Sequence, residues 1–232
     1  MIQPYYDEDG ITIYHGDALD VLPTLESATA TCVVTDPPYV IGAVSAGNMA
    51  SKSGGWTDIM NSAGWFRSWY VEVDRILKRR GSFWTFCNWR SLPVVMRAAS
   101  DARLAITSML VWDKEWIGPG GSQGLRPSYE LVALMAGPDF AIPNRGVPDI
   151  WREQVGSYKP HDHPAEKPEA LVRRILTVVA VPQGELVIDP FMGSGTTAES
   201  ARILGHRFIG IEAEERWCEV AARRVSQGVL AI

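Results

Sequence analysis

Two short β-branched runs, far apart in the 232-residue chain, each lead into an Asp-Pro pair. The run Cys32 to Thr35 precedes Asp36-Pro37-Pro38-Tyr39, and the run Leu186 to Ile188 precedes Asp189-Pro190-Phe191-Met192-Gly193-Ser194-Gly195-Thr196-Thr197. Such runs predict buried strands. Because open α/β sheets bind ligands where their strands end, we expect both segments to border one site.

The rest of the chain alternates between strand-like and helix-like patterns. The expected strands are 11–14, 31–35, 82–86, 105–112, 129–135, 186–188 and 207–211. The expected helices are 18–25, 65–77 (ended by Gly81), 92–102, 168–179, 196–204 and 214–225. Helical connections require a largely parallel sheet, so the chain predicts one α/β domain over 1–232 with seven strands. No helix separates 105–112 from 129–135, so this pair is expected to be antiparallel and at one edge.

Composition is that of a soluble globular protein, with 46% hydrophobic and 21% charged residues. No run approaches the ~20 apolar residues of a membrane span, and the polar, acidic start is unlike a signal peptide, so we expect a cytoplasmic protein without membrane contact. Cys32, Cys87 and Cys218 lie in apolar runs. This placement favours buried free thiols over disulfides or a metal site.

The distribution of basic residues indicates more than the net charge of −5. The clusters Lys78-Arg79-Arg80, Arg173-Arg174 and Arg223-Arg224 are interpreted as solvated helix ends, the usual place of charge runs. Isolated basic residues in the middle of the chain are better candidates for phosphate contact. They are Arg126, Arg145, Arg152 and Lys159.

The rear segment has the features of a nucleoside site. Gly193 and Gly195 let the backbone approach a ligand closely, and Glu212, at the end of the next strand, can accept hydrogen bonds from two ribose hydroxyls. No lysine follows the glycines as in a phosphate loop. Taken alone, the segment is also compatible with a tight strand-to-helix connection.

The front segment suits chemistry on an amino group conjugated to a ring. Such an amine is a poor nucleophile, and hydrogen-bond acceptors aimed at its two protons free its lone pair. The Asp36 carboxylate and the Pro37 carbonyl can accept these protons, and successive prolines stiffen the loop. Tyr39 offers a flat face on which that ring can stack. Trp56 and Trp112 can also stack on the ring or pack in the core.

Together and in this order, the two segments resemble the S-adenosylmethionine-dependent amino-methyltransferases of DNA, in particular their β group, in which the catalytic turn precedes the glycine segment. The resemblance covers nearly the whole chain and implies the Rossmann-like class I methyltransferase fold, S-adenosyl-L-methionine as cofactor and DNA as partner. Asp36, Pro37, Pro38 and Tyr39 would be the catalytic residues.

The resemblance also implies a set of cofactor-binding residues. The glycine segment would hold the methionine part, Glu212 the ribose, and Asp17, also a candidate helix N-cap, the adenine. Lys167 would approach the cofactor carboxylate, with His163 structural. The full set is Asp17, Ala18, Asp36, Lys167, Asp189, Phe191, Met192, Gly193, Ser194, Gly195, Thr196 and Glu212.

Within this family, Asp at the first motif position favours adenine N6, whereas Ser is more usual in cytosine-N4 enzymes and Asn would indicate protein glutamine methylation. The target base must leave the duplex to react, and the loop 42–55 is a candidate lid. Recognition is expected from short insertions near 113–128 and 137–160. Segments this short predict a short site, weak specificity or help from a second subunit in a homodimer.

Three other functions account for parts of the same pattern. A cytosine-N4 enzyme of the same fold explains both segments. A nucleotide-binding dehydrogenase explains the glycines and Glu212 but leaves Asp36 to Tyr39 without a role. A DNA-binding module without activity leaves the catalytic turn unexplained. A restriction nuclease can accompany such a methyltransferase.

Overall fold

The computed structural model describes residues 2–38, 59–117, 124–154, 166–179 and 181–226. Strands and helices alternate along the chain. In order they are β1 (Tyr6–Glu8), β2 (Ile11–His15), α1 (Ala18–Val21), the 3₁₀ helix η1 (Leu22–Thr24), β3 (Ala30–Thr35), α3 (Ile59–Ile76), β4 (Leu77–Cys87), α4 (Leu92–Asp101), β5 (Ala105–Asp113), β6 (Tyr129–Ala136), β7 (Ile150–Arg152), α5 (Glu169–Val178), β8 (Leu186–Asp189), α6 (Thr196–Ile203), β9 (Arg207–Glu212) and α7 (Glu215–Ser226).

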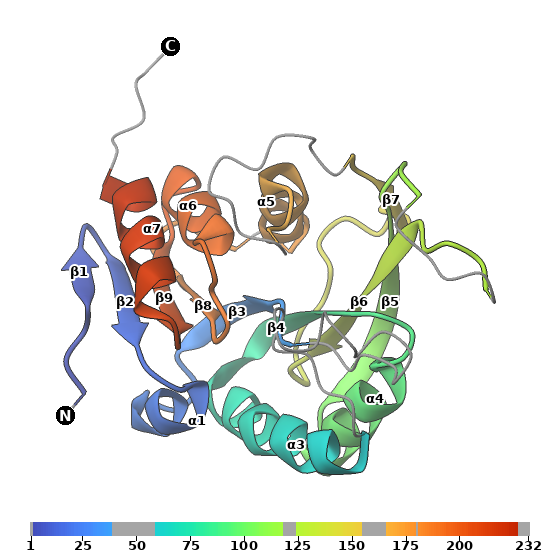
Figure 1. Ribbon diagram of the computed structural model, residues 1–232, viewed down its shortest axis with the longest axis horizontal. Helices are drawn as coiled ribbons and strands as arrows, with labels where there is room; N and C mark the ends of the chain where they lie inside the picture. Colours follow the sequence, from blue (N-terminus) through green and yellow to red (C-terminus); the bar gives the residue numbers. More distant parts are fainter. Residues whose placement is uncertain (1, 39–58, 118–123, 155–165, 180, 227–232) are drawn as a thin grey trace.

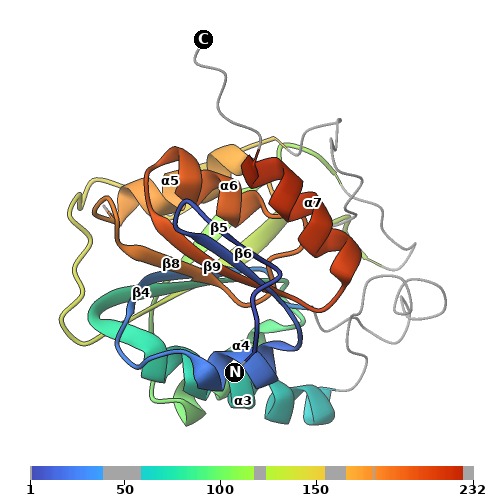
Figure 2. The ribbon, with the colours of Figure 1, turned by 90° about the vertical axis from the view of Figure 1, so that its left-hand side faces the viewer.

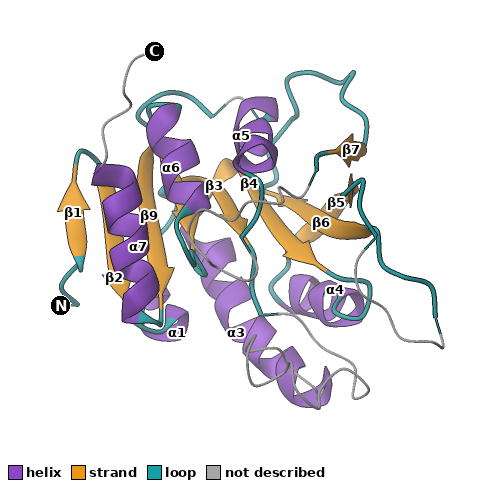
Figure 3. Ribbon diagram, turned by 45° about the horizontal axis from the view of Figure 1, so that its top comes forward, coloured by secondary structure: helices purple, strands orange, loops and turns teal. Residues whose placement is uncertain are grey.

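The described strands form one nine-stranded sheet in the order β1-β2-β9-β8-β3-β4-β6-β5-β7. Helices α1, α3 and α4 cover one face, and α5, α6 and α7 cover the other (Figures 1 and 2). The short strands β1 and β7 lie at opposite edges (Figure 3). Each face of the sheet carries its own cluster of buried apolar side chains. This three-layer arrangement confirms the expected α/β fold class.

The winding of the sheet reverses at β3. This strand pairs in parallel with β4 on one side and with β8 on the other. From β3 the chain passes through α3 to β4, whereas from β8 it passes through α6 to β9 in the opposite direction. The ends of β3 and β8 therefore lie side by side at the switch point, the usual ligand position in such sheets.

Three details differ from the sequence expectation. The sheet has nine described strands instead of seven because β1 and β7 have three residues each, too few to show a periodic pattern. Strands β5 and β6 are antiparallel as expected, but β6 lies between β4 and β5 and so is internal. Gly81 does not end α3; it lies inside β4, where an added Cβ would come within 2.8 Å of the Leu77 side chain.

The basic clusters are only partly solvated helix ends. Lys78 and Arg79 lie in β4, where they form ion pairs with Glu185 and Asp139. Arg224 is 8% exposed, which corrects its assignment to solvent. The three cysteines are free and buried, as expected. Among the described helices, none has the length and apolar content needed to cross a membrane.

A buried carboxylate joins β3 to β8. Asp189 is 3% exposed, and its oxygens accept hydrogen bonds from the Thr35 hydroxyl at 2.6 Å, the Thr197 hydroxyl at 2.7 Å and the Phe191 N–H at 3.1 Å. Burial outweighs these donors and raises the pKa of Asp189 to about 6. One side chain thus fixes the strand pair and the start of the turn after β8.

Replacing Asp189 should change how stability depends on pH. The folded protein keeps this proton up to about pH 6, whereas the unfolded carboxyl releases it near 3.8. The contribution of Asp189 is therefore full below about pH 3.8 and is lost as pH rises to about 6. The free energy of unfolding of wild type, minus that of Asp189→Asn, should fall by roughly 2–3 kcal/mol between pH 4 and 7.

Urea unfolding at a series of pH values measures this difference. Asp139→Asn is the control, because Arg79 lowers the pKa of exposed Asp139 and its small contribution should change in the opposite direction. A wild-type minus Asp189→Asn difference that stays constant from pH 4 to 7 would contradict the prediction.

Candidate functional site

The candidate residues follow four neighbouring parallel strands. In sheet order, β2 leads to Asp17, β9 ends at Glu212, β8 ends at Asp189, and β3 leads to Asp36. Three strand spacings separate the first from the last, about 14 Å. The structure therefore brings the predicted cofactor and catalytic positions together at the carboxyl ends of these strands.

The turn after β8 requires glycine for steric reasons. Gly193 and Gly195 have φ of 55° and 87°, a region that other residues rarely adopt. A Cβ on Gly195 would lie 2.7 Å from Ala221 Cβ in α7. On the other side, the Met192 N–H donates to the Ile211 carbonyl at 3.0 Å. The backbone of the turn is thus packed against two elements at once.

Side chains of the turn are mostly directed into the protein. Met192, Ser194, Thr196 and Thr197 are buried, and the Phe191 ring lies 5.1 Å from that of Trp69 in α3. A ligand at this turn would therefore meet mainly backbone groups. Asp189, whose carboxylate is engaged by Thr35 and Thr197, shapes the turn from below.

Glu212 links the turn to the neighbouring strand. Its Oε2 accepts the Gly193 N–H at 3.0 Å, and its Oε1 accepts the Glu214 N–H at 2.8 Å. Burial raises the pKa of Glu212, although the backbone donors oppose this shift. A carboxylate has about four acceptor positions, so Glu212 can accept a hydrogen bond from a ribose hydroxyl in addition to those from the backbone.

Asp17 caps α1, as its sequence position predicts. Its carboxylate accepts the Leu19 N–H at 2.8 Å, and the side chain is exposed, followed by buried Ala18. The preceding Gly16 N–H donates to the Glu212 carbonyl at 2.9 Å, so Asp17 and Glu212 are held close to each other. Contact of Asp17 with a cofactor adenine stays a prediction.

The Asp36 carboxylate forms an ion pair with Lys167. The Lys167 Nζ contacts Asp36 Oδ2 and lies 3.4 Å from Glu130 Oε2. Burial opposes the lysine charge, but the two carboxylates outweigh it and raise the pKa of Lys167. The second predicted partner, Pro37, is buried, and Pro38 is half-buried.

Several sequence predictions lie outside the described residues. They are Tyr39, the candidate lid 42–55, Trp56, Lys159 and His163, together with parts of both recognition insertions. Trp112 is described and is 2% exposed, with its indole N–H donating to the Glu153 carbonyl at 2.8 Å. Of the two expectations for Trp112, packing in the core is the one that the structure shows.

Sequence reasoning missed the charged residues that surround Asp36 and the glycine turn. Glu130 and Lys114 form an ion pair next to Lys167. Glu130 is an acidic residue near the start of an apolar strand, and this signal was available in the sequence. The pairing of Glu130 with Lys167 was not, because these two residues come from separate segments that meet only in the folded chain.

Arg224 is the second such group. From α7 it forms ion pairs with Glu199 of α6 and, at 2.9 Å, with Glu166, and its guanidinium also reaches the Ser194 carbonyl at 3.5 Å. Arg224 and Glu166 have side chains that are 7% and 8% exposed. This buried cation fastens the glycine turn to the residue preceding Lys167.

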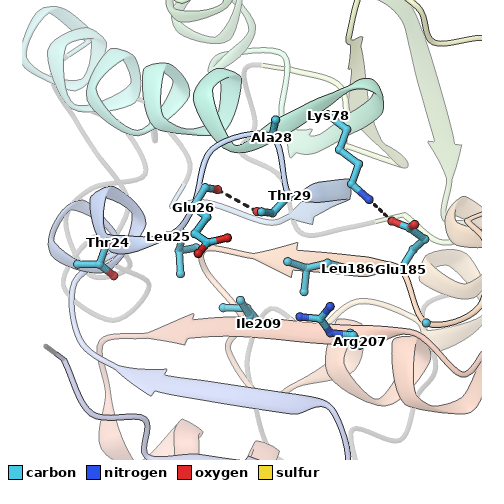
Figure 4. Close-up of a pocket in the computed structure, with 11 residues that line it drawn as sticks. Thr24, Leu25, Glu26, Ala28, Thr29, Lys78, Glu185, Leu186, Arg207 and Ile209 are labelled. Atoms are coloured by element: carbon cyan, nitrogen blue, oxygen red, sulfur yellow. Dashed lines mark hydrogen bonds and ion pairs between the residues drawn. The ribbon is translucent and has the colours of Figure 1, made fainter.

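A cavity of about 490 Å³ lies at the opposite ends of the strands (Figure 4). Its lining includes Glu26, Lys78, Glu185 and Arg207, none of which belongs to the predicted site. Within the described ranges, no cluster of three or more histidine, cysteine or acidic side chains is arranged to hold a metal ion.

Curated proteins that are similar to the chain over nearly its whole length include M2.DpnII and YhdJ. The type II methyltransferase M2.DpnII of Streptococcus pneumoniae is 26% identical over 254 residues, covering 97% of this chain and 93% of that protein. DNA adenine methyltransferase YhdJ of Escherichia coli (strain K12) is 26% identical over 260 residues, covering 95% and 84%.

Solved structures that share the fold include PvuII DNA methyltransferase and M1.HpyAVI. PvuII DNA methyltransferase, which is cytosine-N4-specific, superposes with a TM-score of 0.79 at 18% identity, covering 99% of this chain and 90% of that one. M1.HpyAVI in complex with SAM gives 0.71 at 21% identity, covering 93% and 98%. These matches confirm the class I methyltransferase fold expected from the sequence.

The family model for DNA methylases of the N6/N4 type matches residues 30–147 and 142–223, and so includes Asp36, Lys167 and the glycine turn. With the site geometry above, this match establishes that the chain belongs to the N6/N4 DNA methyltransferase family.

Proposed function

We propose that this protein transfers a methyl group from S-adenosyl-L-methionine to the exocyclic N6 amine of adenine in DNA. One observation carries the proposal: the Asp36 carboxylate and the glycine turn Gly193–Gly195 follow adjacent parallel strands at the switch point. A base amine held by Asp36 would then face a cofactor lying over the turn. The family assignment supports this reading over a dehydrogenase.

The residues at the turn suit S-adenosyl-L-methionine. Gly195 lets the backbone of the turn pack directly against Ala221 of α7, and the Glu212 carboxylate stands one strand away for the ribose hydroxyls. When bound, this cofactor supplies a methyl group on a sulfonium, a good leaving group. The M1.HpyAVI structure was solved with SAM, which supports the same cofactor here.

The catalytic contribution of the chain lies in hydrogen-bond acceptors. The Asp36 carboxylate and the Pro37 carbonyl would accept the two amino protons and so favour the pyramidal amine with a free lone pair. As the N–C bond forms and the bond from the methyl carbon to sulfur breaks, the nitrogen would become positive; Asp36 would stabilise that charge until one proton passes to solvent. No proton needs to be removed beforehand.

The choice of adenine rests on Asp36, since Ser is more usual at this position in cytosine-N4 enzymes. YhdJ, a DNA adenine methyltransferase, supports adenine, whereas PvuII methyltransferase is cytosine-N4-specific. Cytosine N4 is therefore the second candidate. Incubation with labelled cofactor and DNA, followed by digestion and identification of the modified nucleoside, distinguishes the two.

DNA contact is proposed for the segments near 113–128 and 137–160. Arg126, Arg145 and Arg152 are exposed there. Trp116, which follows β5 at the same end of the sheet as Asp36, is 54% exposed. Because these segments are short, we also propose a short recognition site or assistance from a second subunit. Methylation of a randomised oligonucleotide pool tests this; dependence on a long defined site would contradict it. We further propose that the enzyme acts on DNA in the cytoplasm, with or without an accompanying restriction nuclease.

Asp36→Ala should slow methyl transfer at least about 100-fold, because the transition state loses its charged acceptor. The dissociation constant for S-adenosylhomocysteine should change less than about threefold. Single-turnover transfer to DNA and calorimetric binding measure the two effects. Asp139→Ala removes an ion-paired aspartate at the opposite end of β4 and should leave both unchanged. Loss of cofactor binding in Asp36→Ala would instead indicate a structural role.

Glu212→Gln should weaken S-adenosylhomocysteine binding by about 10- to 100-fold, since hydrogen bonds from ribose hydroxyls to a charged acceptor are lost. The transfer rate at saturating cofactor should stay within a few-fold of wild type. Glu214→Gln, on the same turn but with its side chain 58% exposed, is the matched control. Equal binding by Glu212→Gln and wild type would exclude Glu212 from the cofactor site.

A further inference from the structure

Lys167 joins Asp36 to a chain of alternating charges. The Lys167 Nζ pairs with Asp36 Oδ2 and lies 3.4 Å from Glu130 Oε2, and the other Glu130 oxygen accepts a hydrogen bond from Lys114 Nζ. Negative and positive groups therefore alternate in the order Asp36, Lys167, Glu130, Lys114. Their side chains are only 21%, 9%, 14% and 18% exposed.

Each charge in this chain comes from a different part of the fold. Asp36 follows β3, Lys167 precedes α5, Glu130 lies in β6, and Lys114 follows β5. Because β6 runs antiparallel to β5, its start lies beside the end of β5. The internal position of β6, which differs from the sequence expectation, is what brings Glu130 near Lys167.

Aromatic rings support both cations from the sheet. The Lys167 Nζ lies 5.3 Å from the centroid of Phe86, and the Lys114 Nζ lies 5.2 Å from that of Trp112. Both rings are buried and meet edge to face at 6.4 Å. A cation over an aromatic face is attracted by the ring, so each ammonium has an apolar support as well as a carboxylate partner.

The backbone next to Lys167 is also fixed. Glu166 pairs with buried Arg224 at 2.9 Å, and Arg224 in turn holds the glycine turn and α6. Lys167 therefore has little freedom to leave Asp36. The Lys167 ammonium contacts both the Asp36 and the Glu130 carboxylates, so these contacts direct it toward Asp36, the proposed catalytic carboxylate.

We propose that Lys167 is a positioning residue, which holds one oxygen of the Asp36 carboxylate so that the other faces the target amine, and that Glu130, itself paired with Lys114, holds Lys167 in turn. The inference rests on the proposed methyl transfer. It competes with contact between Lys167 and the cofactor carboxylate, the role that the family resemblance implies. Transition-state acceptors act only when their orientation is fixed, so a carboxylate without Lys167 would be a poorer one.

Lys167→Met tests the proposal with two separate readouts. Single-turnover transfer to DNA should be slower by about 100-fold, and Lys167→Arg, which keeps the cation, should recover it to within about tenfold of wild type. Calorimetry should give dissociation constants for S-adenosylhomocysteine and for 5′-methylthioadenosine, which lacks the amino-acid part, within about threefold of wild type for every variant. Glu130→Gln should slow transfer by about tenfold, since Lys167 keeps one anchor.

Lys78→Met is the matched control, because Lys78 is ion-paired with Glu185 at the opposite end of the sheet; its transfer rate should stay within about twofold of wild type. Thermal unfolding checks that the variants are folded, and Lys167→Gln replaces Lys167→Met if the latter does not fold.

Two results would overturn the inference. The first is weaker binding of S-adenosylhomocysteine, but not of 5′-methylthioadenosine, by Lys167→Met, which would place Lys167 on the cofactor carboxylate. The second is transfer by Lys167→Met at the wild-type rate. Absence of transfer by the wild-type protein itself would instead overturn the proposed function.

Discussion

The parallel pairing of β3 with β8 is the constraint on which the site depends. It places the residues after both strands side by side, and the buried Asp189 carboxylate secures it through Thr35 and Thr197. The sheet winds in opposite directions from this pair, which makes the strand ends there the usual ligand position of such sheets. The predicted catalytic turn and the glycine turn therefore lie at the same ends of the strands, although about 150 residues separate them in the chain.

Buried charges then fix the geometry at these strand ends. Arg224 ties the glycine turn to Glu166, and the next residue, Lys167, is paired with Asp36. The two halves of the site are thus connected by ion pairs as well as by strand pairing. Removing one partner of a buried ion pair leaves an uncompensated charge and commonly destabilises a protein by about 3–5 kcal/mol. These pairs therefore favour one arrangement of the site over others. This rigidity suits a reaction that depends on orientation.

Local patterns predicted the fold well because strands such as Leu186–Asp189 are short apolar runs with clear end signals, and helices such as α7 carry clear periodicity. The same patterns located Asp36, Gly195 and Glu212. They could not predict the internal position of β6, which depends on non-local pairing, or the short edge strands. Arg224 illustrates the limit: its spacing from Ala221 places it on the buried face of α7, but only tertiary packing brings the Glu166 and Glu199 carboxylates to it.

The most direct measurement of the central claim is a crystal structure of the protein with S-adenosylhomocysteine and a short DNA containing the target base. We expect the cofactor over Gly193–Gly195 and the base amine within about 3.2 Å of an Asp36 carboxylate oxygen. A cofactor bound elsewhere, for example in the cavity at the opposite ends of the strands, or a base amine remote from Asp36, would contradict it.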